Sequence, residues 1–415
     1  MISIKRLTLS IIIANIFICS YSQTRTNAQK LVFTNEDSLN QGLSKQKTVI
    51  SGYGSAFYQR NFVVQQSRAT LERVVLFVGH QFNSKISLFT ELEIEDALVA
   101  GDGEGKKGEI AMEQAFLKFN LNPRQYIIAG LFVPRIGILN ENHLPVNFNG
   151  VERPLTEQSV IPATWRELGI GFYGKSDKIP LNYSVALLNG LNSEGFQHGS
   201  GIREGRAEGS DASANNLAVT ASLQYNWNEF KFQLSGYAGG TVGLSKRGAD
   251  SLNLKSGAFG TPVYLTEGNI QYNKNAFSAK ALFANVSYPE AGRINTAYAK
   301  NMATDMYGGY LEIAYDWLYK KQQDANFTTF ARYELIDLNA SIPAPPKAIA
   351  DGTLKQHHLI AGISYLPVPN VVIKADVRLL HTDPQNPELV INPPPNALPY
   401  NQNNSFLNIG IGYSF

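Results

Sequence analysis

The sequence is poor in cysteine, in charged residues and in long apolar runs. Its 415 residues include one cysteine, and only 17% of them are charged, against about 25% in ordinary soluble proteins. Lysine and arginine number 36 and acidic residues 34, so there is no basic excess of the kind that binds nucleic acid. Beyond its first segment the chain has no run approaching the roughly 18 apolar residues of a transmembrane helix. A membrane form would therefore have to be a β-barrel.

The first segment has the layout of a secretory signal peptide. Lys5 and Arg6 precede an apolar run over 7–19, and small residues then stand before Gln23. An uncleaved membrane anchor is the alternative, but this run is too short to cross a bilayer as a helix. We expect residues 1–22 to be removed, which leaves 34 basic and 34 acidic residues and no cysteine.

Period-two alternation of apolar and polar residues divides most of the remaining chain into sixteen strand-like segments. These segments are predicted over 48–59, 67–82, 84–99, 109–120, 124–135, 166–174, 180–190, 214–227, 229–242, 262–273, 276–288, 304–318, 325–338, 355–366, 370–382 and 404–415. Residues 23–47 are polar and unpatterned, and we expect a flexible periplasmic lead-in there.

Short and long connections alternate between these segments. Turns such as 82–85 and 226–229 are short and polar, whereas 191–213 and 243–261 are long. This asymmetry is typical of outer-membrane barrels. Residues 48–415 are therefore predicted to form an all-β fold, a transmembrane antiparallel β-barrel of about 16 strands with a wet lumen. A soluble β-solenoid or double sandwich is the alternative.

Alternation also predicts which side chains face the lumen, because lipid requires an apolar outer face. Along 370–382, for example, Ile373 and Val377 alternate with Lys374 and Arg378. The predicted pore-lining residues are Glu91, Glu93, Glu95, Lys280, Glu312, Arg332, Glu334, Lys374, Asp376 and Arg378. In a wet lumen we expect these charges to be solvated without individual partners, and their mixed signs predict weak selectivity.

Aromatic residues beside the short turns are expected to form an interfacial girdle. They include Trp227, Trp317, Tyr319 and Tyr413. The longest connection, 135–165, is expected to fold toward the lumen as a constriction, because loops this long are uncommon and usually functional. Its candidate constriction residues are Glu141, His143, Glu152, Arg153 and Glu157. An exposed loop that caps the rim is the alternative.

Three stretches around this long loop resemble the signature of a known family. Residues 130–137 read Gly-Leu-Phe-Val-Pro-Arg-Ile-Gly, 152–153 read Glu-Arg, and 165–174 read Trp-Arg-Glu-Leu-Gly-Ile-Gly-Phe-Tyr-Gly. Together they are similar to the signature region of the phosphate-selective porin O and P family. The resemblance implies a trimeric outer-membrane porin with sixteen strands.

Other apparent motifs do not predict chemistry. The glycines of 103–108 match a dinucleotide fingerprint by letter, but no helix follows them. His357 and His358 are adjacent on a strand and point to opposite faces, so they cannot share a metal ion. We therefore expect no enzyme, no catalytic residue, no cofactor and no metal site.

The predicted function is passive diffusion of inorganic ions and small hydrophilic solutes through a weakly selective porin. We expect a homotrimer in the outer membrane of a Gram-negative bacterium, in contact with its lipid. A channel specific for an anion such as phosphate, or for oligosaccharides, is an alternative, and it would need a basic or aromatic track. Tyr237 and Phe330 are expected to face inward but make a short track. A barrel enzyme or a structural barrel is a further alternative.

Overall fold

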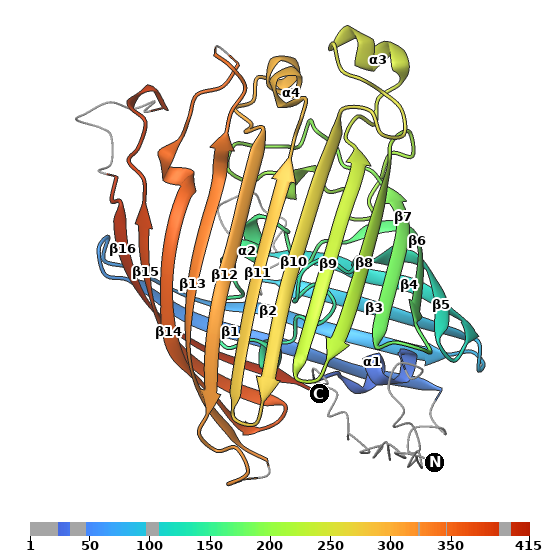
Figure 1. Ribbon diagram of the computed structural model, residues 1–415, viewed down its shortest axis with the longest axis vertical. Coiled ribbons are helices and arrows are strands. Elements are labelled where there is room, and N and C mark those ends of the chain that lie inside the picture. Colours follow the sequence, from blue (N-terminus) through green and yellow to red (C-terminus); the bar gives the residue numbers. More distant parts are fainter. Residues whose placement is uncertain (1–23, 34–46, 97–107, 323, 346, 390–399) are drawn as a thin grey trace, which may run out of the picture.

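The computed structural model describes residues 24–33, 47–96, 108–322, 324–345, 347–389 and 400–415. Its sixteen strands form one closed antiparallel barrel, in which each strand pairs with its sequence neighbours and β1 pairs with β16 (Figure 1). At the closure, Gly52 and Phe415 exchange backbone hydrogen bonds of 3.0 and 2.9 Å. In the described part of the chain, no helix is long and apolar enough to cross a membrane.

The predicted strand number and order are confirmed, and most strand ends differ from the prediction by only a few residues. The strands are β1 (Thr48–Asn61), β2 (Gln66–Gln81), β3 (Ile86–Glu95), β4 (Glu109–Asn122), β5 (Gln125–Phe132), β6 (Glu167–Lys175), β7 (Leu181–Asn189), β8 (Leu217–Trp227), β9 (Phe230–Gly240), β10 (Pro262–Lys274), β11 (Phe277–Ser287), β12 (Asp305–Asp316), β13 (Asn326–Ser341), β14 (Lys355–Val368), β15 (Val371–Thr382) and β16 (Asn403–Ser414).

The two faces of each strand have opposite chemistry. On β16, Ile409 and Ile411 are 45% and 56% exposed on the outside, whereas Asn408 is buried in the lumen. Soluble proteins rarely expose a continuous apolar surface of this kind, so the outer face fits lipid hydrocarbon. The predicted girdle residues are all exposed: Trp227, Trp317, Tyr319 and Tyr413.

Longer connections and short helices gather at one end of the barrel. There Figure 1 shows α3 (Lys246–Ser251) and α4 (Ala291–Tyr298), at the end opposite the short turns and the C-terminus. Three short 3-10 helices also lie in long connections: η2 (Arg203–Gly205), η3 (Gly352–Leu354) and η4 (Pro387–Leu389). The predicted alternation of short and long connections is present from β2 onward, whereas the β1–β2 connection, 62–65, is as short as the turn at 82–85.

Residues 135–165, hereafter the inner loop, make up most of the connection between β5 and β6 and fold into the barrel. It carries η1 (Pro145–Asn147) and α2 (Leu155–Ser159), and α2 lies within the barrel outline in Figure 1. Its apolar side chains join the hydrophobic core with lumen-facing wall residues. Trp165, for example, is fully buried with its ring centroid 4.6 Å from that of Tyr237. The core of this protein therefore lies inside the barrel.

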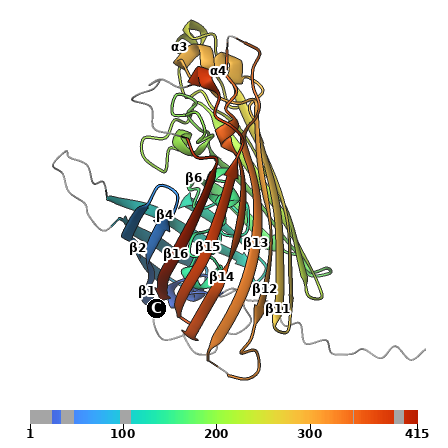
Figure 2. The same ribbon diagram turned by 90° about the vertical axis from the view of Figure 1, so that its left-hand side faces the viewer.

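A second segment enters the barrel near the short-turn end. Helix α1 (Asn27–Val32) lies beside the start of β1 (Figure 1; Figure 2 turns the same view by 90°). It buries Ala28, Leu31 and Val32, which share one helical face. The backbone N–H of Ala28 donates to Ser51 Oγ at 3.1 Å, and Lys118 Nζ donates to Val32 O at 2.9 Å.

We expected a flexible lead-in over 23–47, but within it residues 24–33 pack on the lumen wall through this helix. The rest of that range up to residue 46, the expected signal peptide over 1–22 and the glycine-rich connection at 103–107 lie outside the described residues. The signal peptide and the boundaries of the lead-in stay predictions.

Candidate functional site

The predicted pore-lining residues lie on the lumen side of the wall, but most are buried. Glu91, Glu93, Glu312, Arg332, Glu334, Lys374 and Asp376 are buried, and Glu95, Lys280 and Arg378 are partly exposed. The expectation that lumen charges stay solvated without individual partners is therefore wrong for the buried group. Buried charges require partners, and the inner loop supplies many of them.

Charges on β12 and β13 hold α2 and the segment before it. Arg332 lies between two carboxylates, with N–O distances of 3.1 Å to Glu334 and 3.5 Å to Glu312. Glu334 in turn accepts the Thr156 backbone N–H at 2.9 Å, and Glu312 accepts the Asn149 side-chain amide at 2.9 Å. Lys280 is 4.0 Å from Glu312. These wall charges therefore anchor the inner loop.

Charges on β15 hold the middle of the same loop. Lys374 Nζ donates to Gly150 O at 2.9 Å, and Asp376 accepts the Val151 backbone N–H at 2.7 Å. Arg378 forms an ion pair of 2.9 Å with Glu152. Because each contact joins the wall to the inner loop, these residues fix where the loop lies across the lumen.

Glu157 ties together two parts of the inner loop. Its carboxylate accepts backbone N–H groups from Ile138 and Leu139, both at 2.8 Å, and the Tyr310 hydroxyl at 2.8 Å. Burial raises the pKa of Glu157 to about 7, although these hydrogen bonds oppose the shift. Gly137 has a φ of +76°, and an added Cβ would lie 2.8 Å from this carboxylate, so only glycine fits there.

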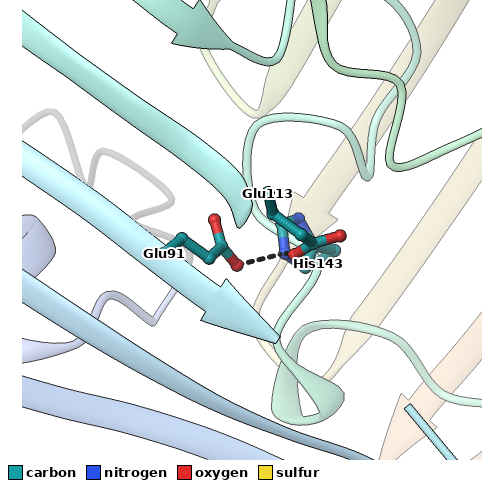
Figure 3. Close-up of side chains that lie close together, drawn as sticks. All are labelled: Glu91, Glu113 and His143. Carbon is teal, nitrogen blue, oxygen red and sulfur yellow. Dashed lines mark hydrogen bonds and ion pairs between the residues drawn. The ribbon is translucent and has the colours of Figure 1, made fainter. Parts of the chain in front are cut away.

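Two further loop residues pair with their surroundings. Glu141 forms an ion pair with Arg135 inside the loop and accepts the Gln224 side-chain amide at 3.2 Å. His143 is buried between Glu91 and Glu113 on the wall (Figure 3). Burial alone would lower the pKa of His143, but the two carboxylates outweigh it and raise this pKa to about 9. The loop is thus held on several sides.

A charged cavity of about 320 Å³ lies between the inner loop and the β2–β4 wall, and we call it the charged cavity. It is lined by Glu72, Arg73, Glu93, Glu95, Glu109, Ala111, Glu113, Arg153, Gln158, Ala163, Thr164, Arg166, Arg203, Glu204, Arg206 and Glu208. Seven glutamates therefore face five arginines around it. Of the residues predicted to line the pore or form the constriction, only Glu93, Glu95 and Arg153 belong to this lining.

Arginines from two connections converge on this cavity. Arg166, just before β6, and Arg206, in the β7–β8 connection, pair with Glu208 at 2.8 and 2.7 Å. Burial lowers the pKa of Arg206, and nearby Arg203 and Arg166 act in the same direction, while Glu208 opposes them. Neither Arg166 nor Arg206 was predicted as a site residue, because Arg206 lies in a long connection without alternation and Arg166 is only the first residue of its predicted strand, 166–174.

Glu72 and Glu113 were also missed, and the reason is local. The β1–β2 register shifts where Ser55 pairs with Arg73 and Ala56 with Leu71, so Glu72 is an extra residue. The β3–β4 register shifts in the same way at Glu113. At each bulge the extra residue, Glu72 or Glu113, faces the lumen. Strict alternation along the strand does not predict this orientation.

Comparisons with known proteins agree with the barrel architecture. No family model matches the chain. An uncharacterized protein of Aquifex aeolicus (strain VF5) is 29% identical over 345 residues, which cover 80% of this chain and 75% of that protein.

Solved outer-membrane proteins share the fold at low identity. OmpF of Salmonella typhi, in complex with daunomycin, matches with a TM-score of 0.53 at 12% identity, over 89% of this chain and 97% of that one. The anion-selective porin of Comamonas acidovorans matches with a TM-score of 0.50 at 11% identity, over 89% and 99% of the two chains. A loop L8 deletion mutant of OmpT, an outer membrane protein of Vibrio cholerae, matches with a TM-score of 0.51 at 9% identity, over the same shares. These likenesses establish a porin-type fold.

Proposed function

We propose that this protein is a weakly selective porin through which ions and small hydrophilic solutes diffuse passively. The observation that supports this function is the charged cavity inside a barrel of porin type, beside the inner loop that folds into the barrel. Its lining offers solutes charged and polar groups and no aromatic surface. Ions that pass there would exchange part of their hydration for contacts with both kinds of charge.

Weak selectivity follows from the composition of the cavity lining. Seven glutamates and five arginines leave a small negative excess when all are ionised. Several are already paired with one another, as Arg73 is with Glu93 at 2.9 Å. Opposite charges this close largely cancel at the distance of a passing ion, so neither anions nor cations gain a large advantage.

We also propose the setting in which the barrel works. Its apolar outer face and aromatic girdle suit the outer membrane of a Gram-negative bacterium and contact with its lipid. A homotrimer is supported by the fold likeness to OmpT of Vibrio cholerae, which was solved in a trimer form and matches with a TM-score of 0.50 at 9% identity.

A channel specific for an anion such as phosphate is the second candidate. Arg166, Arg203 and Arg206 converge on the cavity, and the Arg166 Nε has no hydrogen-bond partner among the described residues. The signature around the inner loop resembles the phosphate-selective porin O and P family. An oligosaccharide channel has less support because Trp165 and Tyr237 are buried away from the cavity lining. We propose no enzymatic activity.

Single-channel recording of the purified protein in a planar bilayer, with a salt gradient across it, tests the proposal. We expect ohmic steps, grouped in threes, with a small reversal potential. Glu109→Gln and Arg203→Gln remove opposite charges from the cavity lining and should shift this potential in opposite directions. Glu388→Gln changes an exposed carboxyl outside that lining and should leave it unchanged.

Two results would count against this function. If the folded barrel gives no steps, the diffusion channel is refuted. If inorganic phosphate blocks the current at sub-millimolar concentration, the anion-specific channel replaces the weakly selective one.

A further inference from the structure

Three side chains from separate parts of the chain meet at one buried point. Glu91 lies on β3, Glu113 on the β4 bulge, and His143 on the inner loop, and all three are buried (Figure 3). His143 Nε2 is 3.1 Å from Glu91 Oε1 and 3.6 Å from Glu113 Oε2. One nitrogen or oxygen atom from each lies within 4.8 Å of the others. We call this group the His–Glu cluster.

In each of the three side chains, the polar atom that points away from the cluster contacts a neighbouring residue. His143 Nδ1 faces the Asn140 carbonyl at 3.4 Å, and Gln114 donates to Glu91 Oε2. The Thr164 hydroxyl donates to Glu113 Oε1. These contacts aim the remaining atoms, one imidazole nitrogen and two carboxylate oxygens, at a common point. Such second contacts are what orients ligands in metal sites.

One carboxylate oxygen in the cluster accepts no hydrogen bond from the described residues, and His143 Nε2 lies 3.6 Å from it. A proton on His143 Nε2 joins it to Glu91, but Glu113 Oε2 is buried without a hydrogen bond among the described residues. A single proton cannot serve both carboxylates, whereas one metal ion can bind all three atoms. Tyr53 also packs its ring edge against His143, with centroids 5.7 Å apart, and its buried hydroxyl has no described partner.

The distances suit a transition-metal ion. Ligand atoms about 2.1 Å from one ion lie roughly 3.0–3.4 Å from each other at octahedral to tetrahedral angles. The two nitrogen–oxygen separations, 3.1 and 3.6 Å, are close to that range. An imidazole ligand favours zinc and its neighbours over calcium or magnesium, which prefer oxygen.

We propose that Glu91, Glu113 and His143 bind one divalent transition-metal ion, such as Zn²⁺, which fastens the inner loop to the β3–β4 wall. Glu113 also lines the charged cavity, so this cavity borders the cluster. The site joins the loop to the β3–β4 wall, whereas the pairs around Arg332 and Lys374 join it to β12–β15. This inference does not depend on the proposed channel function.

Zinc retention by the folded full-length chain, purified without a histidine tag, tests the proposal. The protein is incubated with Zn²⁺, passed over a sizing column with a moderate chelator, and its metal content is measured by mass spectrometry. We expect about one zinc per chain, and at least a tenfold loss in Glu113→Gln and in His143→Gln.

His198→Gln is the matched control. His198 has a similar arrangement, with Nδ1 2.8 Å from the Asn301 carbonyl and Nε2 2.8 Å from Asp351, but only one carboxylate partner. This variant should retain as much zinc as the wild type. Equal retention by wild type and His143→Gln, or no retention by the wild type, would overturn the proposal.

X-ray absorption at the zinc edge of the wild-type protein decides the matter if the cluster variants fail to fold. One imidazole with oxygen donors supports the site. Two or more imidazoles place the ion elsewhere and reject it.

Discussion

The protonation state of Glu157 should control the equilibrium by which its contact with Ile138 and Leu139, within the inner loop, opens and closes. Its pKa is raised from 4.5 to about 7 because the carboxyl is buried. A raised carboxyl pKa means that the folded state binds the proton more tightly than the open state. The stabilisation is therefore complete below pH 4.5 and is lost as the pH rises through 7. The difference between these pKa values corresponds to about 3 kcal/mol, or roughly a hundredfold in the opening equilibrium.

Glu157→Gln should remove this pH dependence. The glutamine oxygen can still accept the Ile138 and Leu139 N–H groups, and its amide can donate to the Tyr310 hydroxyl. Hydrogen exchange of a peptide covering Ile138 and Leu139 measures the opening directly. At pH 5 wild type and variant should exchange at similar rates. At pH 9 the wild type should exchange up to roughly a hundredfold faster than the variant.

Hydrogen exchange is base-catalysed, so its intrinsic rate rises with pH in both proteins. Comparing wild type and Glu157→Gln at the same pH cancels this rise. Glu388→Gln, which changes an exposed carboxyl, should follow the wild type throughout. If wild type and Glu157→Gln keep the same ratio of rates from pH 5 to pH 9, the reasoning about this carboxyl is refuted.

Three other perturbations test the roles of the inner loop, of α1 and of the buried Arg332. Deleting residues 142–158 should raise single-channel conductance if the inner loop is the constriction; unchanged conductance would remove that function from the loop. Gly79→Ala should raise conductance by displacing α1, since its Cβ would lie 2.8 Å from Ala28 O, and an unchanged value would show that α1 does not obstruct ions. Arg332→Gln leaves the buried Glu334 without its cation and Glu312 with only Lys280 at 4.0 Å, and it should destabilise the barrel by about 3–5 kcal/mol in urea unfolding. The exposed Arg124→Gln should cost less than about 1 kcal/mol, and equal losses would contradict the burial argument.

Strand number and facing could be predicted because they depend on local chemistry. Lipid forces an apolar residue at every second position, and this pattern is readable along β15 and β16. Polar turns between strands mark one end of the barrel. The alternation and the polar turns are each visible within a stretch of a few residues. They can therefore be read without knowing which distant segments contact one another.

The contents of the lumen could not be predicted in the same way. Lys374 and Asp376 bind Gly150 and Val151, which lie more than two hundred positions earlier in the chain. No periodic pattern relates such distant segments. The bulge at Glu113 breaks the alternation itself, because two residues there face one on the partner strand.

The charges of the lumen divide into two sets with different consequences. Those on β12–β15, such as Arg332 and Lys374, are buried against the inner loop, so changing them should first move the loop or weaken the fold. On β2–β4, Glu95 and Glu109 line the charged cavity and remain at least partly exposed to it, unlike the buried Glu91, Glu93 and Glu113. Selectivity should therefore depend on the second set, even though alternation assigns residues of both sets to the lumen. A wall charge acts on a passing ion only where no loop atom has already neutralised or covered it.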